Sequence, residues 1–112
     1  IRLFDAEGGY RNEHIVHDTD IQRVVNDLFA AGALGLEIGG QRLINTSSIR
    51  CAGPTILVNH RPITVNPITI KAVGQPLILK GALEMIQNEL KAFGVRLEIE
   101  EMENLALTKY TR

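Results

Sequence analysis

Two segments with helical periodicity, each lying between segments with strand alternation, constrain the fold of this chain more than any other feature. In both segments large apolar residues recur three and four positions apart, which places them on one face of a helix. In the first segment they are Ile21, Val24, Val25, Leu28 and Phe29. In the second they are Leu79, Leu83, Ile86, Leu90 and Phe93. Each helix therefore has one face to bury, and the neighbouring strands provide a sheet to bury it against.

The residues at the helix ends agree with this periodicity. Thr19 and Gln22 have the spacing of a capping box, and Asp18 suits the positive end of a helix dipole. Gly32 suits the position just after the first helix, where a positive φ is common. Pro76 suits the first turn of the second helix, because its missing N–H would have no partner there.

Alternation of apolar and polar residues predicts strands around both helices. The strand segments are residues 1–7, 33–38, 41–44, 48–52, 55–58, 66–74 and 95–100, with a short edge strand at 104–108. Gly39-Gly40 is typical of a two-residue hairpin turn. The order β-α-β-β-(β-β)-α-β predicts an α+β fold, a ferredoxin-like split βαβ plan with extra central strands. We expect a mostly antiparallel sheet with two helices on one face and the other face partly wet.

Composition limits the class of protein. The 112 residues show no linker or repeat, so we expect one domain covering residues 1–112. A formal net charge of −1 without a basic cluster argues against nucleic-acid binding, which needs a surplus of Lys and Arg. No apolar run approaches the ~20 residues that cross a bilayer. Because the chain begins with isoleucine rather than methionine, we expect it to be a piece of a longer protein.

Few residues suggest a catalytic or metal-binding role. Cys51 is the only cysteine, so it cannot form an internal disulfide, and we interpret it as a small half-buried side chain rather than a nucleophile. Glu13, His14, His17 and Asp18 are metal-ligand types, but residues three apart on an extended segment point to opposite faces. The favoured interpretation is a polar segment leading into the helix. We therefore predict no catalytic residue, no metal site and no cofactor.

A polar stretch near the middle of the chain is the main candidate site. Short hydrogen-bonding side chains and two arginines gather there and could bind a carboxylate or a phosphate. The candidate ligand or partner residues are Arg42, Asn45, Ser47, Ser48, Arg50 and Asn59. A loop whose side chains satisfy their own backbone is the favoured alternative, and the residues alone do not decide between the two.

The same stretch and its flanks carry a family resemblance. The quoted motifs are "VNDLFAAGA" at 25–33, "GQR" and "TSSIRCAGPTILVN" within 40–59, "PITIKAVG" at 67–74 and "GVRLEIEE" at 94–101. Together they resemble the bacterial family called domain of unknown function 881, over nearly the whole chain. His60 and Gln75 depart from the usual turn and cap residues of that family. The family has no established activity for these departures to affect.

The resemblance implies a cellular context. Family members look like single-pass envelope proteins of Gram-positive and related bacteria, with a cytoplasmic start, a membrane helix, a coiled coil and this domain outside. Their genes often lie near cell-division genes. The resemblance thus implies a C-terminal extracytoplasmic domain of a cell-membrane protein, held to the membrane through a segment absent from this chain. It also implies a fold similar to the ferredoxin-like plan.

Two functions remain open at this point. We expect a non-catalytic interaction domain associated with cell division, with a protein partner or self-association, and with no nucleic acid. The alternative is a small-molecule or anion-binding module that uses Arg42, Arg50 and the stretch from Asn45 to Ser48. An enzyme using Cys51 or the histidines has no catalytic motif to support it.

Overall fold

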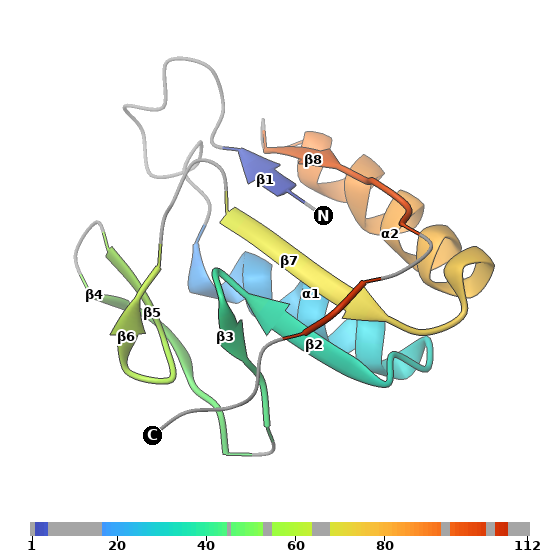
Figure 1. The fold of residues 1–112 in the computed structure, drawn as a ribbon. Helices are drawn as coiled ribbons and strands as arrows, with labels where there is room; N and C mark the ends of the chain where they lie inside the picture. Colours follow the sequence, from blue (N-terminus) through green and yellow to red (C-terminus); the bar gives the residue numbers. More distant parts are fainter. Residues whose placement is uncertain are drawn as a thin grey trace.

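The fold was obtained as a computed structural model, which describes residues 2–4, 17–44, 46–52, 55–63, 68–92, 95–102 and 105–107. It contains two helices and several short strands (Figure 1). Their bounds are β1 Arg2–Phe4, α1 Asp18–Ala30, β2 Gly35–Ile38, β3 Gln41–Arg42, β4 Ile49–Ala52, β5 Thr55–Val58, β6 Arg61–Pro62, β7 Ile68–Val73, α2 Pro76–Lys91 and β8 Arg96–Glu98.

The larger sheet has five antiparallel strands in the order β3-β2-β7-β1-β8. Figure 1 shows α1 and α2 on the same face of this sheet. β4, β5 and β6 form a second, three-stranded antiparallel sheet. The predicted α+β class is confirmed, whereas the ferredoxin-like assignment stays a prediction. The expectation that the central strands would join one sheet is corrected, because β4–β6 pair among themselves.

One core joins the two helices and both sheets. Aliphatic residues from α1 and α2 pack against alternate residues of β2 and β7, and β5 contributes to the same cluster. The completely buried members include Ile21, Val24, Leu28, Leu36, Ile38, Val58 and Ile70. The helical faces predicted from periodicity are therefore the buried faces among the described residues, except that Phe29 is exposed; Phe93 lies outside the described residues.

The helix ends are partly as predicted. Gly32 has a φ of +92° and donates to Phe29 O at 3.0 Å, while Ala33 donates to Leu28 O at 3.0 Å. These two bonds are a Schellman motif, so the predicted C′ glycine is confirmed. The predicted Thr19 cap is wrong, because α1 begins after His17, whose backbone N–H donates to the Asp20 carboxylate at 2.9 Å.

Two of the hairpins turn through residues with positive φ. Gly39 and Gly40 join β2 to β3 with φ values of +53° and +84°, as predicted. Asn59 and His60 join β5 to β6 with φ values of +55° and +64°. Two successive positive φ values match the twist of a two-residue hairpin, and asparagine tolerates this region better than most residues.

Residues 105–107 lie on the sheet face away from the helices (Figure 1). Leu105 and Leu107 are half-buried, and a Cβ built on Gly35 would lie 2.9 Å from Leu107 Cδ1. Glu37 lies on this face, is 2% exposed, and has its carboxylate 3.4 Å from Lys71 Nζ. The face is partly wet, as expected, since the Lys71 side chain on it is 43% exposed. The edge strand predicted at 104–108 is not formed by its described residues 105–107.

β4 is attached to the amino end of α1 rather than to the larger sheet. Cys51 N donates to Asp18 Oδ2 at 3.1 Å, and Asp18 N donates to Cys51 Sγ at 3.3 Å. Gln22 Nε2 donates to Ile49 O at 2.8 Å. Cys51 is exposed, so the half-buried interpretation is wrong. None of the helices in the described part of the chain has both the length and the apolarity to cross a membrane.

The first hairpin gives a paired test of steric contact and backbone strain. A Cβ on Gly40 would meet no atom within 4 Å, so Gly40→Ala adds only the left-handed strain, about 1–2 kcal/mol. A Cβ on Gly39 would lie 2.6 Å from Ile63 Cβ, so Gly39→Ala adds overpacking and lowers the unfolding free energy by about 2–5 kcal/mol in all. Urea unfolding measures both, and equal losses would contradict the predicted contact with Ile63.

The link between α1 and β4 gives a second test. Asp18→Ala removes the acceptor of Cys51 N and a negative charge in the first helical turn, so we expect a loss of about 0.5–2 kcal/mol. Asp27→Ala, near the other end of α1, is the control and is expected to change the unfolding free energy by less than about 0.5 kcal/mol. Thermal unfolding compares the two variants, and equal effects would mean that Asp18 does not hold β4.

Candidate functional site

The predicted polar residues lie around the junction of β3, the loop before β4 and the β5–β6 turn. Arg42 ends β3, Arg50 lies on β4, and Asn59 is the first residue of the turn. Ser47 and Ser48 precede β4, and Asn45 lies outside the described residues. The structure therefore brings together Arg42, Ser48 and Asn59, which are joined by the hydrogen bonds described next.

Backbone hydrogen bonds use much of this polar set. Ser47 Oγ accepts from Ile44 N at 2.7 Å, and Ser47 N donates to Ile44 O at 2.9 Å. Asn59 N donates to Ser48 O at 3.0 Å. Ser47 thus closes a local turn, as the alternative of a self-satisfied loop predicts. Its hydroxyl is already engaged before any ligand is considered.

Asn59 is the unusual member of the set. Its side chain is buried, and Nδ2 donates to Arg42 O at 2.9 Å. Its Oδ1 is also buried and has no hydrogen-bond partner among the described residues. A buried acceptor without a partner is disfavoured by about 1–3 kcal/mol, so this atom is a place where a donor would be stabilised.

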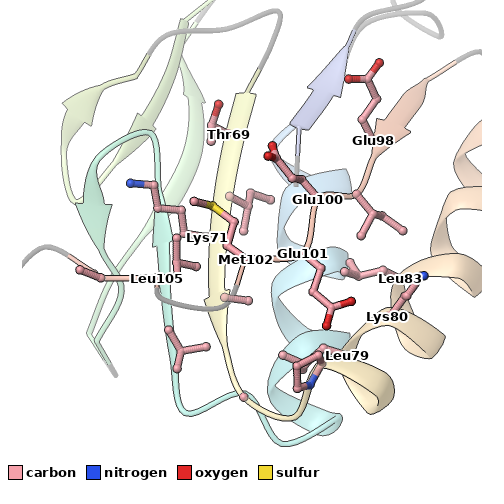
Figure 2. Close-up of a pocket in the computed structure, with 17 residues that line it drawn as sticks. Thr69, Lys71, Leu79, Lys80, Leu83, Glu98, Glu100, Glu101, Met102 and Leu105 are labelled. Atoms are coloured by element: carbon pink, nitrogen blue, oxygen red, sulfur yellow. The ribbon is translucent and has the colours of Figure 1, made fainter.

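A groove on another part of the surface was not predicted. It has a volume of about 680 Å³ and lies between the second half of β7, one side of α2 and the segment that follows β8 (Figure 2). Leu79 and Leu83 contribute apolar surface from α2, and Met102 and Leu105 contribute it from the far wall. We call this space the β7 groove.

Charged groups surround the apolar part of the β7 groove. Lys71 and Lys80 line it from β7 and α2, while Glu98 lines it from the end of β8, and Glu100 and Glu101 from the segment after β8. Lys71 also pairs with buried Glu37 on the covered sheet face. The groove thus offers an apolar floor with charges of both signs at its rim, which suits an amphipathic polypeptide better than a compact anion.

A third feature is the end of the molecule where α1 stops and α2 starts. Figure 1 shows the carboxyl end of α1, the loop to β2 and the amino end of α2 at this same end. Four large apolar side chains of these segments are exposed, namely Phe29 46%, Leu34 82%, Leu77 85% and Ile78 51%, and Met85, nearer the middle of α2, is 69% exposed. We call them the apolar end.

The sequence contains a pattern that partly indicates the apolar end. Leu77, Gly81 and Met85 are four residues apart and share a helical face, but it is not the face that packs on the core. Leu34 continues the alternation of β2 in the sequence, yet β2 begins only at Gly35, so its side chain is outside the core. Two apolar faces on one helix are the signal that points to a second contact.

Comparison with known proteins places the chain in a family. The model of "Bacterial protein of unknown function (DUF881)" matches residues 1–112. UPF0749 protein YlxW of Bacillus subtilis is 38% identical over 81 residues, which cover 70% of this chain and 34% of that protein. UPF0749 protein Rv1823 of Mycobacterium tuberculosis is 45% identical over 65 residues, 58% of this chain and 21% of that protein.

A solved structure gives the same fold. The crystal structure of an uncharacterized conserved protein from Mycobacterium tuberculosis superposes with a TM-score of 0.67 at 17% identity, covering 95% of this chain and 85% of that one. The chain spans only about a third and about a fifth of the length of the two curated relatives. None of these names is that of an enzyme. The chain belongs to the DUF881 family of bacterial proteins of unknown function.

Proposed function

We propose that this chain is a non-catalytic interaction domain of a bacterial envelope protein, lying outside the cell membrane and serving cell division through a protein partner or self-association. The observation that carries this proposal is the apolar end, where five large apolar side chains from α1, the loop to β2 and α2 are exposed. Soluble monomeric domains expose single apolar side chains routinely, whereas a contiguous group is typical of an interaction surface.

The chemistry of the apolar end favours a protein partner. Leucine, isoleucine, methionine and phenylalanine side chains offer dispersion and desolvation rather than hydrogen bonds, and they complement another apolar protein surface. Gly81 lies between Leu77 and Met85 on the same face, and a Cβ there would meet no atom within 4 Å. Another backbone can therefore approach α2 closely at this position.

The test places a photo-reactive residue at position 81 in the full-length protein, expressed in its own bacterium. We expect covalent adducts with a protein or with a second copy, and at least a tenfold loss of adducts in the double variant Leu77→Glu, Met85→Glu. Both side chains are exposed, so the double variant is expected to keep its unfolding free energy within about 1 kcal/mol.

Thr46→Glu is the control for added negative charge, since residue 46 is exposed in the loop before β4 rather than on α2. Its adducts are expected to match those of the unchanged protein. Adducts that persist in the double variant would rule out the apolar end as the contact surface. Absence of adducts together with a purely monomeric sedimentation profile would remove the support for an interaction domain.

The alternative function, small-molecule or anion binding, is favoured by the unpartnered Oδ1 of Asn59. A hydroxyl-bearing phosphate could donate to this atom while Arg42 or Arg50 contacts the phosphate. With glycerol 3-phosphate at ten times its dissociation constant we expect about 1.4 kcal/mol of stabilisation, or several degrees in melting temperature. Arg42→Gln combined with Arg50→Gln is expected to abolish the shift. If 10 mM ligand (roughly the weakest affinity of interest) gives no shift in melting temperature, the ligand-binding function is excluded and the interaction domain is the remaining proposal.

A further inference from the structure

The β7 groove begins where strand β1 stops covering β7. β1 pairs with β7 only through Arg2 with Thr69 and Leu3 with Ile68. On its other edge β7 pairs with β2 along four residues, from Ile70 to Val73. The second half of β7 therefore has a described strand on the β2 side, whereas on the β1 side it borders the groove.

The backbone of Ala72 points into the groove. Gly39 N donates to Thr69 O at 2.9 Å and Leu34 N donates to Val73 O at 2.7 Å, so Thr69 and Val73 direct their polar groups toward β2. Backbone groups of successive strand residues alternate between the two neighbours. Ala72 lies between residues that face β2, so its N–H and C=O face the groove. Among the described residues no strand pairs with it there.

The two walls of the groove continue the register of β1. Arg2 lies opposite Thr69 on one side and opposite Glu98 on the other. Each step back along an antiparallel strand is a step forward along both neighbours. If β1 continued backwards as a strand in this register, the residue before Ile1 would lie opposite Lys71 and Glu100. The residue before that one would lie opposite Ala72 and Glu101, and the next opposite Val73 and Met102. All six of these residues line the groove.

We propose that the β7 groove binds the polypeptide that immediately precedes these 112 residues in the longer protein. This preceding segment extends β1 as a strand and pairs with Ala72. The relatives support the existence of additional chain in the family, because the matched segment is 34% of one relative and 21% of another. The amino end of β1 opens into the groove, so chain leaving it in this direction competes with any other occupant for the same space.

The residues that line the groove also determine which positions of this strand are polar and which are apolar. Positions opposite Ala72 share the face of Ile70, which packs under the helices, and they lie near Leu79 and Leu83. Positions opposite Lys71 share the other face, where Glu37 and Glu100 lie. The preceding segment is therefore expected to be polar in its last residue and apolar in the one before it.

Hydrogen exchange in the longer protein tests the pairing at one amide. We expect the Ala72 amide to exchange as slowly as that of Lys71, which is paired with β2. Replacing the three residues that precede the chain by Gly-Ser-Gly is expected to speed exchange at Ala72 at least tenfold and to leave Lys71 unchanged. An Ala72 amide that exchanges rapidly in the unaltered longer protein would overturn the proposal.

A disulfide test checks the register and the identity of the occupant. In a Cys51→Ser background, a cysteine at the residue preceding Ile1 is combined with Glu100→Cys or, as control, with Glu101→Cys. We expect an intramolecular disulfide at least tenfold faster with position 100, because directly opposite Cβ atoms lie about 4.5–5.5 Å apart. Disulfides between two molecules would assign the groove to a second copy, and equal rates would exclude the register, so either result overturns the proposal.

Discussion

The pairing of β2 with β7 is the interaction on which the rest of the structure depends. β7 is the middle strand of the larger sheet, and its buried residues Ile68 and Ile70 form the floor on which both helices rest. On the opposite face of the same pair, Glu37 and Lys71 form an ion pair. A slip of one residue would move Glu37 into the aliphatic layer, so the two faces together fix the register.

Much of the local structure could be predicted because short-range chemistry determines it. The apolar stripes of both helices, the Gly32 ending and the Gly39-Gly40 hairpin depend on neighbours a few residues away. The start of α1 could not be, because His17 is an uncommon N-cap and Asp20 completes the contact. The position of β4 could not be predicted either, because it depends on a hydrogen bond to Asp18 of α1, which lies more than thirty positions earlier in the sequence.

The candidate sites show the same limit. Ser48, Asn59 and Arg42 were expected to act together because their residue types suit a ligand, and backbone hydrogen bonds do join them. The β7 groove could not be predicted from the sequence, because its walls come from β7, α2 and the segment after β8. No pattern within one segment reveals a gap in strand pairing. Only the register of β1 shows that no described strand pairs with β7 on this side beyond Thr69.

The uncovered length of β7 has a consequence for how the domain behaves when it is separated from its surroundings. A strand with backbone donors and acceptors exposed on one side is a template for pairing with other chains, and proteins usually protect such edges. Pieces that start at β1 would carry this edge in the middle of their sheet, beside an apolar floor. Their solubility, rather than their folding, would then depend on where the polypeptide is cut.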